Sequence, residues 1–318
     1  MYQKRPYPSV LLTAVLLLLA GGAAQATISH TWVSSTGSDA NACTRSAPCA
    51  TFAGALTKTS AGGEIDVADA GDYGPVTISQ AVSIEAVGVL ATIQVTSGNA
   101  ITISTGANDT VVLRGLTLDG QGTAGDGIRF TSGGTLYIED SRIHRFTTGI
   151  DFLPTNSTST SKLFVTDTIV RNNGSGGTGC GVFIQSSLGY AVASIDGLRT
   201  ENNVCGVKVQ DSANVTIRNS VAANNGFSGF SAVGVGNLPR MLIESSITTH
   251  NGTNGITSAD LSGGGGIGSP QVRLSNVTVV DNQTGLATSG VGEIISFGNN
   301  KVDGNSTNGS PTSTIPPR

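Results

Sequence analysis

The chain has 318 residues, of which 44 are glycine, 5% are aromatic and 12% are charged, and its formal net charge is −4 at pH 7. This mildly acidic balance disfavours nucleic acid and anionic membranes as partners. The composition would be typical of a disordered chain if it had no period, but Gly, Asn, Ser and Thr fall between short apolar segments, as turns require.

Residues 1–26 have the pattern of a secretory signal. Lys4 and Arg5 precede an apolar run over residues 11–20 and a small-residue cleavage site at residues 24–26. The run is too short to span a bilayer, and no later segment could. We therefore expect a secreted or periplasmic protein. Its net charge would be −6, because 15 of the 17 basic residues remain against 21 acidic ones.

Residues 27–62 are predicted to form an N-terminal segment with a short amphipathic helix. Phe52 and Leu56 lie four residues apart, and Gly62-Gly63 ends the pattern. Because the first coil of a solenoid exposes its core, we expect this helix to cap the open end.

A glycine followed by alternating apolar residues then recurs at intervals of 22 to 32 residues. Self-similarity at this period indicates stacked repeats, and the period-2 alternation indicates strands with one buried face. No long stretch has a helical period. The repeat glycines are Gly127, Gly149, Gly181, Gly206, Gly229, Gly255 and Gly285.

Aligning one apolar residue from each repeat brings a polar column into line eight residues later. We interpret that column as an asparagine ladder, in which stacked side chains bond to one another and to the turn backbone. The residue before it is interpreted as a turn residue, His250 included. The apolar column is Ile138, Val165, Ile195, Ile217, Ile243 and Leu274, and the ladder is Asn173, Asn203, Asn225, Asn251 and Asn282.

These patterns predict an all-β protein, a single right-handed parallel β-helix over residues 63–304. Each repeat is one coil, and equivalent strands stack about 4.8 Å apart. The polar, proline-containing residues 305–318 are predicted to be a disordered tail.

Four cysteines in an exported protein favour disulfides. Cys43 and Cys49 lie in one loop, whereas Cys180 and Cys205 each precede a repeat glycine in adjacent coils. Stacked positions lie within the roughly 4.4–6.8 Å Cα range that a disulfide needs, so we expect the pairs Cys43–Cys49 and Cys180–Cys205. A Cys₄ metal site would need Cys-x-x-Cys pairs, which are absent.

The N-terminal motifs, followed by these coils, resemble bacterial secreted right-handed β-helix proteins of the pectate-lyase-like superfamily. The resemblance covers about residues 31–304 and implies the fold. It leaves function open, because the superfamily includes lyases, hydrolases, esterases, epimerases and binding or structural proteins. The motifs are Trp32-Val33-Ser34-Ser35-Thr36-Gly37-Ser38-Asp39, Ala47-Pro48-Cys49-Ala50-Thr51-Phe52, Gly62-Gly63-Glu64-Ile65 and Gly71-Asp72-Tyr73.

The catalytic patterns of this superfamily are absent or incomplete. Polygalacturonase-like members use clustered aspartates with a Gly-His-Gly motif, which does not occur here. The histidines, His30, His144 and His250, are isolated in the sequence. The zinc-protease motif His-Glu-x-x-His and the hydrolase motif Gly-x-Ser-x-Gly are also missing.

Pectate-lyase-like members use Ca²⁺ held by surface carboxylates, with an arginine as base. The best match is an acidic column just after the apolar one, with Arg142, Arg171 and Arg199 further along. The alternative is structural: Arg114 would stack beside Glu139 as an ion pair, and the next position would be a turn. The acidic column is Glu139, Asp140, Asp167 and Asp196.

Outward aromatic residues on neighbouring coils indicate carbohydrate contact. Tyr137 and Phe164 are adjacent, and Phe183 lies on another strand row together with Arg129, Asp151 and Lys208. The alternative for Tyr137 and Phe164 is cross-strand stacking under the long turn at residues 155–161.

We therefore expect a non-catalytic protein that binds an extracellular or surface polysaccharide. The alternative is a Ca²⁺-dependent lyase acting by β-elimination. No cofactor is expected, apart from Ca²⁺ if the protein is a lyase. Neither a nucleic-acid partner nor a membrane span is expected. Any site should lie between about residues 127 and 205. The expected ligand contacts are Tyr137, Glu139, Asp140, Phe164, Asp167 and Asp196.

Overall fold

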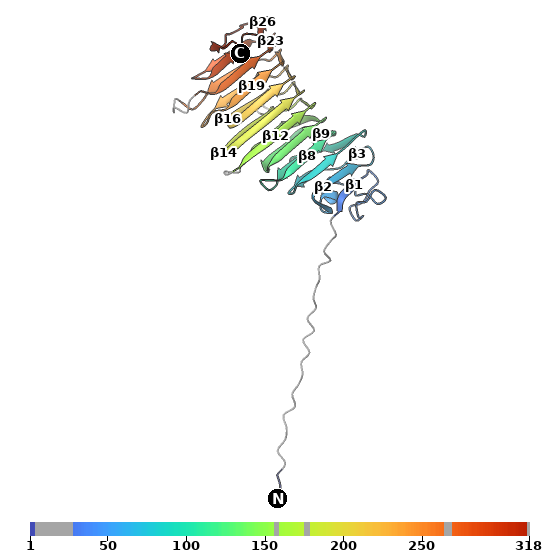
Figure 1. Ribbon diagram of the computed structural model, residues 1–318. Helices are drawn as coiled ribbons and strands as arrows, with labels where there is room; N and C mark the ends of the chain where they lie inside the picture. Colours follow the sequence, from blue (N-terminus) through green and yellow to red (C-terminus); the bar gives the residue numbers. More distant parts are fainter. Residues whose placement is uncertain (4–27, 156–158, 175–178, 264–268, 317–318) are drawn as a thin grey trace.

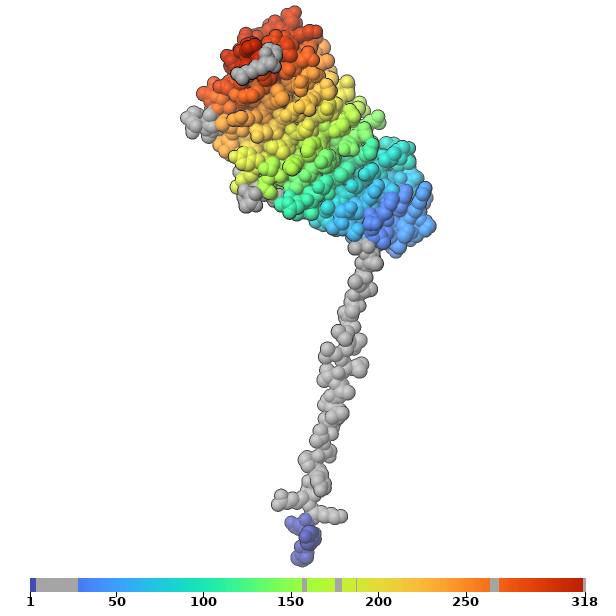
Figure 2. All heavy atoms as spheres, in the orientation of Figure 1, coloured from blue at the N-terminus to red at the C-terminus, as the bar shows by residue number. Residues whose placement is uncertain are grey.

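A computed structural model describes residues 1–3, 28–155, 159–174, 179–263 and 269–316. The expected signal at residues 1–26 therefore lies almost wholly outside the described residues. Strands stack as successive rungs from the N-terminal to the C-terminal end of one body (Figure 1), and the coils follow one another in chain order along it (Figure 2). All the strands that pair with one another among the described residues run parallel, as a parallel β-helix requires.

The strands form three faces, each a stack of parallel rungs. Face 1 carries the apolar column of the sequence analysis. Its members are β1 (Ile28–Val33), β2 (Thr59–Val67), β5 (Val82–Glu85), β8 (Thr110–Arg114), β10 (Thr135–Glu139), β12 (Thr160–Thr166), the second part of β14 (Cys180–Asp196) and of β16 (Cys205–Arg218), β19 (Arg240–Glu244), β22 (Gln271–Ser275), β25 (Glu293–Ser296) and β27 (Ser313–Thr314).

Face 2 consists mostly of short strands. They are β3 (Gly71–Asp72), β6 (Ala91–Gln94), the first part of β9 (Leu116–Ser132) and of β11 (Arg142–Phe152), β13 (Ile169–Arg171), β15 (Arg199–Glu201), β17 (Val221–Ala223), β20 (Ile247–Thr249), β23 (Thr278–Val280) and β26 (Lys301–Asp303).

Face 3 completes each coil. It contains β4 (Val76–Ile78), β7 (Ile101–Ser104), the second part of β9 and of β11, the first part of β14 and of β16, β18 (Ser228–Gly234), β21 (Asn254–Asp260) and β24 (Thr284–Ser289).

The predicted apolar column is confirmed residue by residue. Ile138 pairs with Val165, and the register continues through every expected member to Leu274. The column also extends towards the N-terminus, where Leu113 pairs with Ile138. These side chains are buried, and their removal from water is the main term that stabilises the stack.

The asparagine ladder is confirmed and is longer than predicted. In each rung the side-chain Nδ2 donates to the Oδ1 of the next asparagine, at 2.9 Å from Asn173 to Asn203 and at 2.9 Å from Asn225 to Asn251. The same oxygens accept bonds from backbone N–H groups, as at Asn203 N to Asn225 Oδ1 (3.1 Å). Asn282 donates in the same way to Asn305, a further rung.

The residue before each ladder asparagine has a left-handed backbone. The φ angle is 56° at Asn172 and 56° at His250, so His250 is a turn residue as predicted. Asparagine tolerates this conformation better than most residues, which explains its frequency there.

The repeat glycines are required by close approach between coils rather than by backbone dihedrals. A Cβ built on Gly206 would lie 2.2 Å from the carbonyl oxygen of Gly229, and one on Gly149 would lie 2.6 Å from that of Gly181. Real Cβ atoms do not approach that closely, so each glycine allows the next coil to stack.

The predicted helix is α1 (Phe52–Leu56), which begins after the N-cap Thr51 and buries Phe52 and Ala55. Its function as a cap of the open end remains a prediction. Ahead of it, β1 pairs with β2 and covers the first rung. Among the described residues, no helix is long and apolar enough to cross a membrane.

Both predicted disulfides are present. Cys43 pairs with Cys49 at a Cα separation of 4.7 Å, and Cys180 pairs with Cys205 at 4.5 Å. The tail differs from the expectation of disorder. From Asn305 to Pro316 the chain stays on the body, because β27 pairs with β25 and Thr312 N donates to Ile294 O (2.8 Å).

Candidate functional site

Face 3 carries a row of polar and aromatic side chains on four successive strands. Arg129 of β9 lies opposite Asp151 of β11, which lies opposite Phe183 of β14, which lies opposite Lys208 of β16. Their chain neighbours point inward and are buried, so the alternation of each strand places these four on the outside. Because the strands pair in this register, four residues that span about 80 positions of the sequence lie side by side in one row.

Two adjoining hollows lie along this row. The first has a volume of about 380 Å³ and is lined by Asp126, Arg129, Asp151, Phe183 and Lys208 among others. The second, of about 460 Å³, is lined on its far side by Phe227. Lys208 and the disulfide residue Cys180 line both, so the two hollows adjoin each other.

Arg129 joins two carboxylates at the end of the first hollow. Its Nη1 bonds to Asp126 Oδ2 at 3.1 Å and also to Asp151 Oδ2. Asp151 is only 5% exposed, and its Oδ1 is buried with no hydrogen-bond partner among the described residues. Burial, and next the Asp126 carboxylate, raise the pKa of Asp151 to about 7, although Arg129 opposes the shift.

Lys208 is the cation between the two hollows. Its Nζ lies 5.3 Å from the centre of the Phe183 ring, a cation–π contact. Burial lowers the pKa of Lys208, while Asp211 opposes this shift. Within the part of the chain that the structure describes, no carboxylate lies within ion-pair distance of this ammonium. A half-buried cation with no carboxylate partner is suited to an anionic ligand.

Two of the predicted contact residues, Tyr137 and Phe164, pack on each other. Their ring centres are 4.7 Å apart and their planes differ by 11°. One face of each ring is therefore covered by the other ring, which is the cross-strand stacking given above as the alternative to carbohydrate contact. Part of the turn expected to overhang them, residues 156–158, lies outside the described residues.

The predicted acidic column lies on or just after face 1, but its members are not gathered. Arg114 Nε lies 3.5 Å from Asp140 and 3.9 Å from Glu139. Asp140 and Asp167 have left-handed backbones, with φ angles of 49° and 46°, so they are turn residues. Asp196 accepts a bond from Asn219 Nδ2 at 2.8 Å. These four carboxylates do not fit a Ca²⁺ site, which needs several oxygens around one point.

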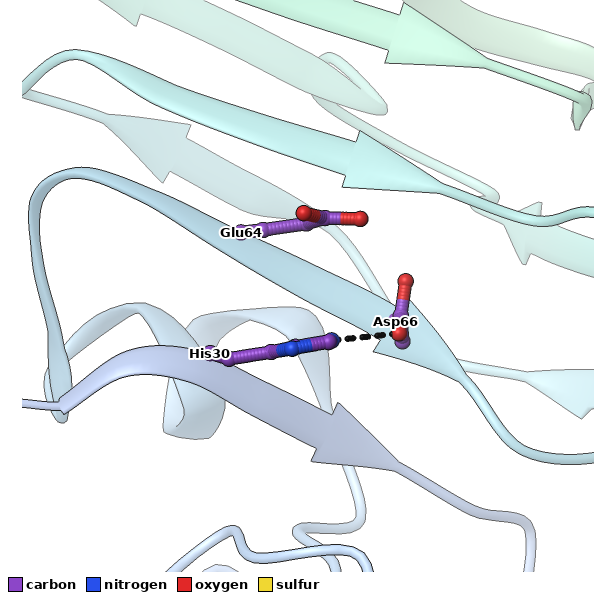
Figure 3. Close-up of side chains that lie close together, drawn as sticks. All are labelled: His30, Glu64 and Asp66. Atoms are coloured by element: carbon purple, nitrogen blue, oxygen red, sulfur yellow. Dashed lines mark hydrogen bonds and ion pairs between the residues drawn. The ribbon is translucent and has the colours of Figure 1, made fainter.

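A different group of possible ligands lies where β1 meets β2. His30 Nε2 is 2.5 Å from Asp66 Oδ2, and one ligand atom of each of His30, Glu64 and Asp66 lies within 4.8 Å of the others (Figure 3). Burial, and then the Asp66 and Glu85 carboxylates, raise the pKa of Glu64. It is the only such group of three among the described residues.

Four residues of the row on face 3 were expected to point outward, but no hollow was predicted around them: Arg129, Asp151, Phe183 and Lys208. Asp126 was not predicted from the sequence, and His30 was interpreted as isolated. Once the first strand is known to pair with the second, the alternation of His30 and Trp32 on one and of Glu64 and Asp66 on the other predicts that His30 lies beside the two carboxylates.

No known protein family and no curated protein matches this chain at the level of sequence. Solved structures do match. A pectate lyase, Pel9A, has 17% identity and a TM-score of 0.63, covering 89% of this chain and 80% of its own. The protein has a pectate-lyase-like β-helix fold. A rhamnogalacturonan lyase has 16% identity and a TM-score of 0.54, covering 88% of each chain. At such identities the likeness shows the fold alone.

Proposed function

We propose that this protein binds an extracellular polysaccharide in the two adjoining hollows of face 3. The observation that carries the proposal is the combination of the Lys208 ammonium, which has no ion-pair partner among the described residues, the buried Asp151 carboxyl and the exposed Phe227 ring in two adjoining hollows. Phe227 is 51% exposed and offers a ring face for a sugar. Lys208 would attract a carboxylate on the polymer, and Asp151 would bond a hydroxyl.

The arrangement of the two hollows supports a chain-like ligand. The hollows, of about 380 and 460 Å³, share Lys208 and run across successive strands, which suits consecutive sugar units rather than a single one. The two disulfides and the expected export signal support an extracellular setting. The two similar structures are lyases named for the polysaccharides pectate and rhamnogalacturonan, which makes these polymers the first probes.

Affinity electrophoresis and calorimetry with pectate, rhamnogalacturonan and a neutral glucan test the proposal. We expect binding of an anionic polymer that weakens at least about tenfold in Lys208→Ala and in Phe227→Ala. Tyr137→Ala, which removes an outward ring from face 1, is the matched control and should bind as the wild type does. Unchanged binding in both face 3 variants, or loss of binding only in the control, would refute this placement.

A second candidate function is β-elimination by the same hollow. The observation that favours it is that Lys208 and Asp151 line the same hollow, where burial lowers the pKa of Lys208 and raises the pKa of Asp151. The neutral amine of Lys208 would take the proton from the carbon next to a sugar carboxylate. The electron pair would form a C=C bond as the glycosidic C–O bond breaks, and Asp151 would protonate the departing oxygen.

Ultraviolet absorbance separates the two functions, because elimination leaves a product with a C=C bond conjugated to the carboxylate. Binding without any rise in absorbance supports the non-catalytic function. A rise that Lys208→Ala abolishes, with binding only weakened, supports the lyase.

A further inference from the structure

The geometry points to a binding site for a divalent transition-metal ion, of which Zn²⁺ is the probe, formed by His30, Glu64 and Asp66. The three side chains project from one side of β1 and β2, with His30 directly opposite Glu64 and Asp66 one pleat further along (Figure 3). An imidazole nitrogen and two carboxylate oxygens lie within 4.8 Å of one another. This site is independent of the hollow on face 3.

The charges around the three residues support a cation. Glu85 of β5 lies opposite Asp66, so three carboxylates occupy two neighbouring strands. None of the three lies within ion-pair distance of a lysine or arginine among the described residues. Two other outward carboxylates of face 1 do have such a partner: Arg114 lies 3.9 Å from Glu139, and Arg218 lies 3.1 Å from Glu244. An ion at His30 would supply the missing positive charge.

The imidazole is already held in place. The His30 ring stacks on Trp32 with ring centres 5.3 Å apart, and Arg45 lies 5.0 Å from the Trp32 ring centre. The His30 Nε2 atom faces Asp66. A ligand fixed by packing loses little freedom when the ion binds, which favours affinity.

The donor set selects the class of ion. Imidazole suits Zn²⁺, Cu²⁺, Fe²⁺ and Ni²⁺, whereas a site for Ca²⁺ or Mg²⁺ would be built from oxygens. Zinc bonds of about 2.0–2.2 Å to nitrogen and carboxylate oxygen place two ligand atoms of one Zn²⁺ ion no more than about 4.4 Å apart. Small side-chain rotations from the present arrangement, with the ion replacing the His30–Asp66 hydrogen bond, meet this limit. Three protein ligands leave a coordination position for water.

Binding would join the first strand of the protein to the second. β1 is the first strand of face 1; it pairs with β2 on one side, and on its other side Val33 bridges to Cys49 of the disulfide loop. Because the site requires β1 to be docked, the ion would bind the folded end selectively and stabilise it.

Calorimetry with Zn²⁺ on chelator-treated full-length protein, prepared without a polyhistidine tag, tests the inference. We expect one site per chain. His30→Ala and Glu64→Gln should each weaken it at least about tenfold, since even indirect partners of a ligand cost about 10–100-fold. His250→Ala, which removes an exposed histidine of a turn, is the matched control and should leave the affinity unchanged.

A thermal melt gives a second readout that does not depend on the affinity of a variant. Saturating Zn²⁺ should raise the melting temperature of the wild type and of His250→Ala but not that of His30→Ala. Circular dichroism establishes that each variant is folded. Absence of Zn²⁺ binding to the wild type, or binding that survives both His30→Ala and Glu64→Gln, would overturn the inference.

Discussion

Arg129 and Asp151 lie directly opposite each other on β9 and β11, and the Arg129 guanidinium bonds to one oxygen of Asp151, while the other is buried and has no partner among the described residues. A buried carboxyl with half of its bonding capacity unused is costly for a fold unless a proton or a ligand uses it. This relationship is one reason why we place the proposed polysaccharide site in the hollow of face 3.

Asp151→Asn is expected to flatten the pH dependence of stability between about pH 4 and pH 7. The pKa of Asp151 is raised to about 7 in the folded protein, whereas an unfolded aspartate titrates near 3.9. The folded state thus keeps a proton that the unfolded chain has released. The free energy of unfolding therefore falls as pH rises through this window, by up to about 1.4 kcal/mol per pH unit.

Urea unfolding at several pH values measures this slope. Asp303→Asn, at an exposed position, is the control and should keep the wild-type slope. A slope equal in wild type and Asp151→Asn would contradict the assignment of the proton to Asp151.

Gly206→Ala is expected to destabilise the protein by about 1–3 kcal/mol or more, as overpacking does. The added methyl group would lie 2.2 Å from the Gly229 carbonyl oxygen of the next coil. Because this oxygen belongs to the backbone, it cannot move aside as the end of a flexible side chain could. Gly236→Ala is the matched control, because nothing lies within 4 Å of its added Cβ. The urea midpoint of Gly206→Ala should be clearly lower than that of Gly236→Ala. Equal midpoints would show that the stack accommodates the added methyl group without losing stability.

Asn225→Ala is expected to cost about 3 kcal/mol, since it leaves several buried partners unsatisfied at roughly 1–3 kcal/mol each. The Asn225 side chain donates to Asn251 and to the Thr200 carbonyl, and it accepts from the backbone N–H of Asn203. Asn108→Ala, at an exposed position, should change stability little. Similar losses in both variants, measured by urea unfolding, would argue against the ladder as a stabilising element.

Replacing Cys180 and Cys205 together by alanine is expected to lower stability by about 3.5 kcal/mol. The disulfide closes a loop with a sequence separation of 25, and a cross-link of that length restricts the unfolded chain by about this amount. Because both cysteines line the hollow, polymer binding should weaken as well. Unfolding midpoints and affinity electrophoresis of the double variant measure the two effects, and no loss of stability would contradict the first.

The register of the coils could be predicted from the amino-acid sequence. Ile138 and Val165, and the ladder from Asn173 onward, were aligned correctly, and the Cys180–Cys205 pair followed from the same alignment. These features repeat at every coil and depend on one residue type at one position, so the period alone reveals them.

Which outward side chains lie close together could be learned only from the folded structure. Asp140 and Asp167 were expected either to contact a ligand or to form turns, and both have the left-handed backbone of a turn. Contacts between outward side chains depend on loop lengths that vary from coil to coil and on which residue happens to lie on the neighbouring strand. The approach of His30 to Glu64, which is 34 positions away, therefore has no periodic signal in the sequence and follows from the pairing of β1 with β2.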